Sequence, residues 1–277
     1  MTSLCHELQR LYCLPDQSCL VTSDGGLLQT VPLTDSLLAQ AMTGQANIAL
    51  PLQDAQDHVR TLVLTADRNR DWPHLATLYA ELEQDFDLPL PALAVLADGG
   101  YQLWFSFAAP IPLAHGEAFL AGLQRQYLSQ IPEHAVHGLP NAQDNDAHLA
   151  LVPNWHTASG RWSAFIDPSL GGMFAEEAGL DVPPNLEGQA SILARFSTIK
   201  TAAFQRVLAQ LQAAPTPVEH ATTPAPAPVL SLPLGIDTPF TDPKAFLLAV
   251  MNSPATSGEL RVQAAAALLP YYEKPKA

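Results

Sequence analysis

The sequence predicts an α+β fold in which helices alternate with β-hairpins along one chain. Apolar runs joined by an Asp-Gly-Gly turn occur twice, at residues 19–31 and 93–107, and each is typical of an antiparallel strand pair. Stretches with apolar residues at helical spacing lie between and after them, for example at 72–86 and 115–128. With 277 residues, the chain is long enough for one large domain and a small appendage.

The individual elements follow from the same two periodicities and from the residues that interrupt them. Proline and glycine end most of the periodic stretches, and Thr or Asp precedes the short helix after the first hairpin. In chain order the sequence predicts a helix over 3–12, a hairpin over 19–31, a helix from Thr34 or Asp35 through Met42, strands over 47–52 and 60–66, a helix over 72–86, a hairpin over 93–107, a helix over 115–128, a strand over 148–152, a turn and strand over 159–167, and one helix over 188–212.

The second hairpin combines a glycine turn with polar residues on one strand face. Alternation along the strand places Gln102 and Trp104 on the same face, just after Gly99 and Gly100. Glycines allow close approach to the backbone, which favours a ligand site here. An ordinary buried hairpin with a polar edge explains the same residues. The opposite face of the strand would carry Tyr101, Leu103, Phe105 and Phe107.

The composition changes after the last predicted helix of the body. Seven prolines lie among Ala and Thr between residues 213 and 240, which is typical of an extended linker. Helical spacing returns over residues 241–277, where a pair of short helices is expected. We therefore divide the chain into an N-terminal helix and hairpin (1–30), a main domain (31–212), a linker (213–240) and a helical tail (241–277). The tail either docks on a protein partner or folds back on its own domain.

The charge of the chain limits its partners. The net charge is −14, from 13 basic and 27 acidic residues, whereas nucleic-acid affinity draws heavily on Lys and Arg. Arg60, Arg68 and Arg70 form a local basic cluster in the sequence. An acidic body with one such cluster favours a protein partner or a single phosphate site over duplex binding.

The cysteines and the apolar runs indicate a cytoplasmic protein. Cys5, Cys13 and Cys19 are odd in number, which favours reduced thiols, and their spacing does not match a zinc site. No apolar run approaches the roughly 18 residues of a membrane helix, and the first residues lack the basic segment of a secretory signal. We therefore expect no membrane association.

Four stretches follow one another in an order known from one superfamily. They are LTDSLLAQAMTGQANIALPL at 33–52, TLVLTADRNRDW at 61–72, LPALAVLADGGYQLWFSFAAPIP at 90–112 and LPNAQDNDAHLALVPNWHTASGRWSAFID at 139–167. Together they resemble the archaeo-eukaryotic primase (primase-polymerase) superfamily over residues 31–200, and most of all the primase-polymerase domain of TOTE-type conflict systems. The resemblance implies an RRM-like core, with a mixed or antiparallel sheet flanked by helices.

The resemblance also assigns roles. The second stretch resembles a metal motif in which a strand ends in Asp-x-Asp, and the third resembles a Ser-Gly-x-Gly turn followed by a His and an aromatic strand. By this likeness Asp67, Gln102 and Asp144 are candidate catalytic residues, and Asp67 and Asp144 are candidate ligands of Mg²⁺ or Mn²⁺. A nucleotide or a single-stranded nucleic acid would occupy the cleft between them. The candidate nucleotide-binding residues are Arg68, Arg70, Gly99, Gly100, Tyr101 and Trp104.

The departures from the motifs matter as much as the likeness. Thr65 stands where the first carboxylate of the metal motif is expected, and Gln102 stands where the phosphate-contacting histidine is expected. The turn serine is replaced by Ala97 or Asp98, and the third acidic position could be Asp146 instead of Asp144. A two-metal clamp needs paired carboxylates, so the polymerase chemistry is expected to be lost.

Three hypotheses remain open from the sequence. The first is a catalytically degenerate primase-polymerase-like protein, which would act as a binding or regulatory subunit of a phage-related or mobile-element replication or defence module. The second is an active primase, polymerase or nucleotidyltransferase with an atypical metal site. The third is an unrelated α/β protein in which Asp67 is a turn residue, Gln102 an edge amide and Asp167 a cap. Trp155 and Trp162 could stack a base, although core or rim packing is the commoner role.

Overall fold

The computed structural model describes residues 3–15, 17–23, 28–44, 46–141, 148–213 and 248. The chain divides into two units, Met1–Val218 and Glu219–Ala277, and every helix and strand named below belongs to the first. Apart from Ala213 and Leu248, the predicted linker and helical tail lie outside the described residues.

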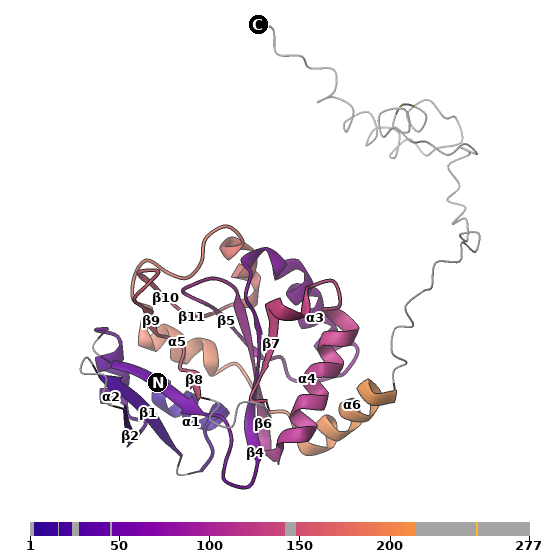
Figure 1. Cartoon of the computed structure of the whole chain (residues 1–277), viewed down its shortest axis with the longest axis horizontal. Helices are drawn as coiled ribbons and strands as arrows, with labels where there is room; N and C mark the ends of the chain where they lie inside the picture. Colours follow the sequence, from indigo (N-terminus) through magenta and orange to yellow (C-terminus); the bar gives the residue numbers. More distant parts are fainter. Residues whose placement is uncertain are drawn as a thin grey trace, which may run out of the picture. The chain divides into compact units, whose positions relative to one another are not determined.

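A five-stranded antiparallel sheet forms the centre of the first unit (Figure 1). The predicted hairpin at 93–107 is confirmed as its β5–β6 pair, with Val95 opposite Tyr101 across the turn. In spatial order the strands are β11 (Ala164–Ile166), β5 (Ala92–Val95), β6 (Tyr101–Pro112), β4 (His58–Ala66) and β7 (Val136–Leu139).

The predicted hairpin at 19–31 is also confirmed, and it belongs to a second sheet. Its first strand pairs with a later strand as well as with its hairpin partner, so the boundary expected at residue 30 does not separate two structural units. This antiparallel sheet has the order β2 (Leu28–Pro32), β1 (Ser18–Ser23), β3 (Ala46–Pro51) and β8 (His148–Ala150), and a separate two-stranded ribbon pairs β9 (Trp155–His156) with β10 (Arg161–Trp162).

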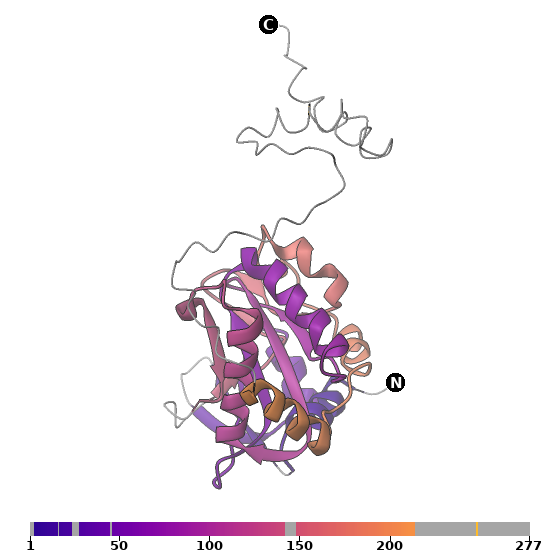
Figure 2. The same cartoon turned by 90° about the vertical axis from the view of Figure 1, so that its right-hand side faces the viewer.

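Helices and the second sheet cover the two faces of the central sheet, as Figures 1 and 2 show. One face packs against α3 (Trp72–Gln84), α4 (Leu113–Tyr127) and α6 (Thr201–Ala213). The other face packs against α1 (Leu4–Tyr12), α5 (Leu186–Leu193) and the second sheet with its helix α2 (Asp35–Ala41). Short 3₁₀ segments are η1 (Asn69–Asp71), η2 (Glu133–Ala135) and η3 (Pro168–Phe174).

Alternation along the inner strands builds the two cores. Leu62 and Leu64 of β4 join the core under α3, α4 and α6, while Val63 and its β6 partner Trp104 join the core under α1 and α5. Successive side chains of a strand point to opposite faces, so a strand covered on both faces becomes apolar nearly throughout. The predicted division of the second hairpin into two faces is therefore confirmed.

The C-terminal end of α1 is fixed to the central sheet through its backbone carbonyls. The last carbonyls of a helix have no partner inside the helix, and three sheet side chains supply one here. The Thr61 hydroxyl donates to the Tyr12 carbonyl (2.9 Å), and the Ser106 hydroxyl donates to the Leu11 carbonyl (2.5 Å). The Arg60 guanidinium donates to the carbonyls of residues 10, 13 and 107.

The single helix predicted over 188–212 is wrong, because two helices, α5 and α6, occupy this stretch. Leu193 of α5 is buried in one core and Phe204 of α6 in the other, so the chain must cross from one face of the central sheet to the other. It crosses at Ile199, which forms a parallel bridge with Phe107 of β6. One continuous helix would have kept both apolar stripes on the same face of the sheet.

The other predicted elements agree with the structure. The Thr34 hydroxyl accepts a hydrogen bond from the Leu37 amide and caps α2, as predicted. The thiols of Cys5, Cys13 and Cys19 are free and buried. Within the described ranges, every helix is too short or too polar to cross a membrane.

Candidate functional site

Three polar side chains line up across adjacent strands on the α1 side of the central sheet. Gln102 of β6 lies opposite Thr65 of β4, and Thr65 lies opposite His137 of β7. We call these three residues the polar row. The Gln102 Nε2 donates to the Thr65 Oγ1 at 3.3 Å, and both side chains are buried. The row extends toward the sheet edge, where burial decreases.

Asp67 and His137 form an accessible pair at the outer end of the polar row. Asp67 follows β4, and its Oδ2 lies 2.7 Å from the His137 Nε2. The side chains are 46% and 50% exposed, so a ligand could reach both from solvent. Asp67 and Gln102 thus lie at the same end of the sheet, with Thr65 opposite Gln102 in the strand register.

Gly100 of the glycine turn packs against the end of β4 and leaves no room for a ligand at its own Cα. A Cβ added at Gly100, whose φ is +87°, would lie 2.1 Å from the Ala66 carbonyl oxygen and 2.9 Å from the Asp67 Cα. The Gly100 amide also donates to the Asn69 side chain. The prediction that a ligand approaches the backbone at Gly100 is thus corrected, because Ala66 and Asp67 fill that space; a Cβ added at Gly99 would lie 3.2 Å from the Asn69 side-chain oxygen.

The two aromatic residues predicted to bind nucleotide are core residues. Tyr101 points to the opposite face of the sheet, where its ring packs on Trp72 and its hydroxyl donates to the Gly171 carbonyl (2.8 Å). Trp104 is 1% exposed and packs edge-on against Tyr12 and Phe165. Neither ring is accessible to a ligand, because alternation places one in each core.

The basic cluster in the sequence is separated in the structure. Arg60 lies near the start of β4 and donates to α1 carbonyls, whereas Arg68 lies beyond the other end of the strand, on the order of 20 Å away. The Arg68 Nε donates to Asp71 at 2.8 Å. Arg70 is exposed. The expectation of one local phosphate-binding cluster is therefore wrong.

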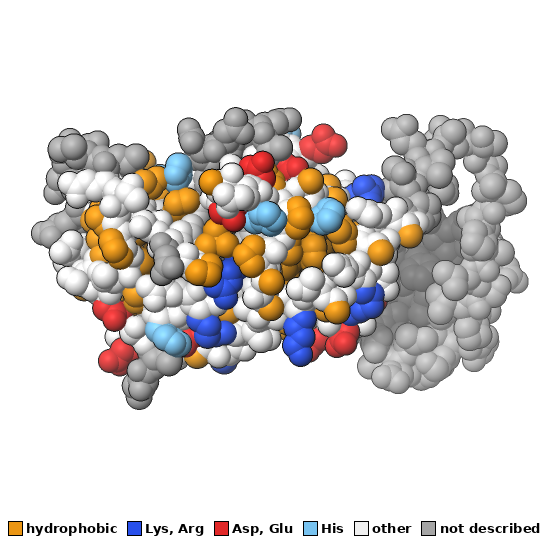
Figure 3. All heavy atoms as spheres, turned by 90° about the horizontal axis from the view of Figure 1, so that it is seen from below, with side chains coloured by type: hydrophobic (Ala, Val, Ile, Leu, Met, Phe, Trp, Pro, Cys, Tyr) orange, Lys and Arg blue, Asp and Glu red, His pale blue; other side chains and the backbone are white. Residues whose placement is uncertain are grey.

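Few cationic groups are available anywhere in the described ranges. Of the nine Lys and Arg residues there, seven already bind a carboxylate or a backbone carbonyl of the chain: Arg10, Arg60, Arg68, Arg125, Arg161, Arg195 and Arg206. Only Arg70 and Lys200 have no such partner in this part of the chain. On the face drawn in Figure 3, the basic side chains form small separate groups, and several have an acidic neighbour. Such a surface offers no continuous path for a phosphodiester backbone.

A small cavity opens beside the glycine turn and ends at the polar row. We call it the hairpin cavity; its volume is about 230 Å³. The polar side chains around it are Asp98, Gln102, Asn154 and His156, and the last two come from the segment leading into β9 and from β9 itself. The apolar wall consists of Leu96, Ala97, Ala150 and Val152.

The donors for a metal ion are too few for a two-metal clamp in the described part of the chain. Asp67 supplies one carboxylate, Thr65 is neutral, and no group of three or more His, Cys, Asp or Glu side chains converges within the described ranges. Asp144 and Asp146 lie outside the described residues, so their predicted roles stay predictions. The residues described here do not fit the paired-carboxylate site that the resemblance implies.

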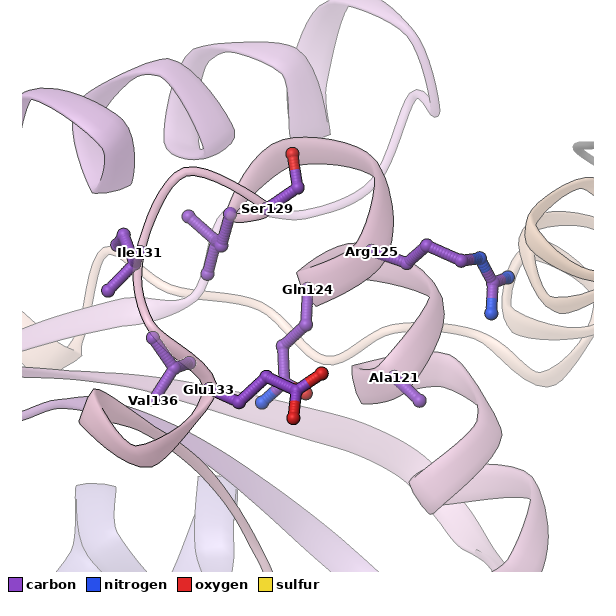
Figure 4. Close-up of a pocket in the computed structure, with 8 residues that line it drawn as sticks. Ala121, Gln124, Arg125, Ser129, Ile131, Glu133 and Val136 are labelled. Carbon is purple, nitrogen blue, oxygen red and sulfur yellow. The ribbon is translucent and has the colours of Figure 1, made fainter. Parts of the chain in front are cut away.

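A second cavity, of about 850 Å³, lies between the end of α4 and the segment that leads into β7 (Figure 4). Its one cationic residue, Arg125, points away from it toward α6, where its Nη2 donates to the Leu211 carbonyl (2.9 Å). Gln124, Ser129 and Glu133 remain as polar lining. None of the residues predicted from the sequence to form a site lines this cavity.

His137 and Asn154 are the site residues that sequence reasoning missed. The strand at 136–139 is only four residues long and follows a loop, so its pairing with β4 left little periodic signal. His156 belongs to a strand of only two residues, which also leaves little periodic signal. Pairing of residues far apart in the sequence is what brings all three to the polar end of the sheet.

No protein-family model matches the chain, and no curated protein matches it. Among solved structures, the AEP domain of the cyanophage S-2L primase-polymerase is 13% identical, with a TM-score of 0.35, and the match covers 64% of this chain and 89% of that one. The polymerase domain of Mycobacterium tuberculosis ligase D, solved in complex with DNA, is 10% identical, with a TM-score of 0.25 and 72% of each chain covered. TM-scores this low do not by themselves establish a shared fold.

Proposed function

We propose that this chain is a primase-polymerase-like protein that has lost polymerase chemistry and acts as a binding or regulatory subunit. The observation that carries the proposal is the pairing at the end of β4: Thr65 replaces one expected carboxylate, and the remaining one, Asp67, is engaged by His137 at 2.7 Å. A two-metal mechanism needs two ions to bridge the attacking and leaving oxygens, and one carboxylate cannot hold both.

The distribution of cations supports the same proposal. Polymerases and primases must bind a triphosphate and a template backbone, and both tasks draw on Lys and Arg. Within the described ranges, the arginines closest in sequence to Asp67 are Arg68, which binds Asp71, and Arg70, which is exposed. A protein with this site would bind small polar ligands more readily than nucleic acid.

Primer extension by the full chain tests the proposal. We expect no product from primed or unprimed templates with dNTPs or NTPs, in Mg²⁺ or in Mn²⁺. A product that disappears in Asp67→Ala and persists in Asp35→Ala, a change at an exposed aspartate of α2, would overturn the proposal. Calorimetry with the triphosphates adds a second criterion, because metal-dependent triphosphate binding would also contradict it.

The alternative is an active nucleotidyltransferase with one metal ion. The accessible Asp67–His137 pair favours it, since a carboxylate and an imidazole 2.7 Å apart could both turn to one cation. Imidazole ligands suit Mn²⁺ better than Mg²⁺, and Asp144 would supply a further ligand. Activity that needs Mn²⁺ and both Asp67 and His137 would favour this alternative.

The biological setting and the partner rest on the sequence alone. The resemblance to primase-polymerase proteins points to a phage-related or mobile-element replication or defence module in the cytoplasm. A protein partner would bind the tail at 241–277. Removal of residues 241–277 should abolish co-purification of that partner and leave ligand binding by the main domain unchanged; loss of both would contradict the assignment.

A further inference from the structure

We propose that the hairpin cavity binds an uncharged planar heterocycle of the nucleobase class. The proposal rests on the function proposed above, because it names a ligand for the cavity at the inner end of the polar row. It depends on which hydrogen-bonding atoms around the cavity are available to a ligand. The hydrogen bonds already made by Gln102, His156 and Asn154 determine this.

The amide of Gln102 is held in one orientation. The indole Nε1 of Trp104 can only donate, and it donates to the Gln102 Oε1 at 3.0 Å. The Nε2 is therefore the group directed to Thr65, at 3.3 Å, and its second N–H has no partner among the described residues. Gln102 is 6% exposed, so this buried amide presents a donor to the cavity and cannot turn to present an acceptor.

His156 also presents a donor. The backbone amide of Ser159 donates to the His156 Nδ1 at 3.4 Å, and the Ser159 hydroxyl lies 2.9 Å from the same atom. An Nδ1 that accepts leaves the proton of the neutral ring on Nε2. The ring nitrogen available to a ligand is thus an N–H.

Asn154, two residues before His156, contributes a third donor. Its Oδ1 accepts from the Ser163 hydroxyl, while its backbone amide donates to the same hydroxyl at 2.9 Å. The side-chain Nδ2 is the part left for a ligand. Three neutral donors around one small space call for a ligand rich in acceptor atoms.

Charge and size exclude the larger acceptor-rich ligands. Among the described residues no Lys or Arg lines the cavity, and the exposed carboxylate of Asp98 at its rim would repel a phosphate. A volume of about 230 Å³ is below the roughly 300–1,000 Å³ of sites that enclose drug-sized ligands, and equals roughly eight waters at about 30 Å³ each. A purine or pyrimidine base fits, because it is planar and neutral, carries several acceptors, and has an N–H for Asp98.

Calorimetry of the full chain with the four ribonucleosides and their 5′-triphosphates tests the proposal. We expect at least one nucleoside to bind, with an affinity that is unchanged between low and high NaCl and is not improved by the triphosphate. Inorganic phosphate should not compete. Triphosphate binding more than about tenfold tighter than that of its nucleoside, competition by phosphate, or no nucleoside binding at millimolar concentration would each overturn it.

Matched variants locate the site. His156→Ala and Asn154→Ala should each weaken the nucleoside about five- to tenfold, the loss of one or two hydrogen bonds, whereas His134→Ala, an exposed imidazole outside the cavity, should change nothing. Trp104→Phe removes the lock on the Gln102 amide and should weaken binding similarly, with folding verified by urea unfolding. If His156→Ala, Asn154→Ala and Trp104→Phe all bound the nucleoside as tightly as the parent protein, the assignment of the site would be overturned.

The two proposals fail separately. Absence of nucleoside binding together with absence of primer extension removes the ligand assignment and leaves the non-catalytic function standing. Primer extension that depends on Asp67 removes the non-catalytic function, whatever the nucleoside result.

Discussion

The α1 side of strands β4 and β6 carries two polar cross-strand pairs, one toward each end, with the apolar pair Val63–Trp104 between them. Thr61 and Ser106 form the first pair, and Thr65 and Gln102 form the second. All four side chains are buried. Their hydrogen bonds nevertheless go to different places, and this difference separates a structural contact from a site.

The hydroxyls of Thr61 and Ser106 both donate to carbonyls at the end of α1. The Gln102 amide bonds only to Trp104 and Thr65 among the described residues and borders a cavity with a donor to spare. Buried polar groups are normally satisfied, so a buried amide with unused capacity beside a cavity is the feature that indicates a ligand.

The largest predicted difference in stability is between substitutions of Arg60, near the start of β4, and Arg70, beyond its end. Arg60→Ala should lower the free energy of unfolding by about 2–4 kcal/mol, because it removes charged donors from carbonyls at the end of α1. Arg70→Ala should change it by less than about 0.5 kcal/mol, since the side chain is exposed and without a partner in the described ranges. Urea unfolding of both variants measures this difference. Equal changes in the free energy of unfolding would refute the structural role of Arg60.

A finer comparison replaces one hydroxyl in each polar pair. Thr61→Val should lower the free energy of unfolding by about 1–3 kcal/mol, because the Tyr12 carbonyl loses its buried hydrogen-bond donor. Thr65→Val should cost less than about 1 kcal/mol, because the freed Gln102 amide borders a cavity that water can enter. The same urea measurement applies. If Thr65→Val lowered the free energy of unfolding as much as Thr61→Val does, the Thr65–Gln102 pair would be a structural contact like the Thr61–Ser106 pair.

The smallest predicted effect is a pH dependence at the α1 end. Burial raises the pKa of the Cys13 thiol to about 12, from 9.0. Between these values the folded protein keeps a proton that the unfolded chain releases, so stability falls as pH rises, by at most about 1.4 kcal/mol per pH unit. Cys13→Ala should lose less stability between pH 8 and pH 10 than the parent protein. An unchanged slope would show that Cys13 is not the group responsible.

Much of the fold could be predicted because its signals are local. The β5–β6 hairpin follows from two apolar runs around Asp98-Gly99-Gly100, and the α2 cap follows from Thr34. The break between α5 and α6 could not be predicted in the same way. Helical spacing continues through Ile199, and only the existence of two cores on opposite faces makes the chain cross there.

The positions of the candidate residues along the strands could be predicted from the sequence, but their surroundings could not. Asp67 and Gln102 were named as candidates from the strand ends that carry them, and the structure places both at the same end of the central sheet. The roles expected for Tyr101 and Trp104 depended on exposure, which alternation alone does not give when both faces of a strand are covered.

By itself the sequence determined the local elements, the neutral Thr65 two residues before Asp67 and the acidic character of the chain. Only the tertiary structure decided which groups are available. It brought His137, Asn154 and His156 to the polar end of the sheet through strand pairing and chain turns. Among the described residues it also left Gln102 with one unused donor while giving Thr61 and Ser106 the α1 carbonyls, because hydrogen-bond satisfaction depends on neighbours that the sequence does not place side by side.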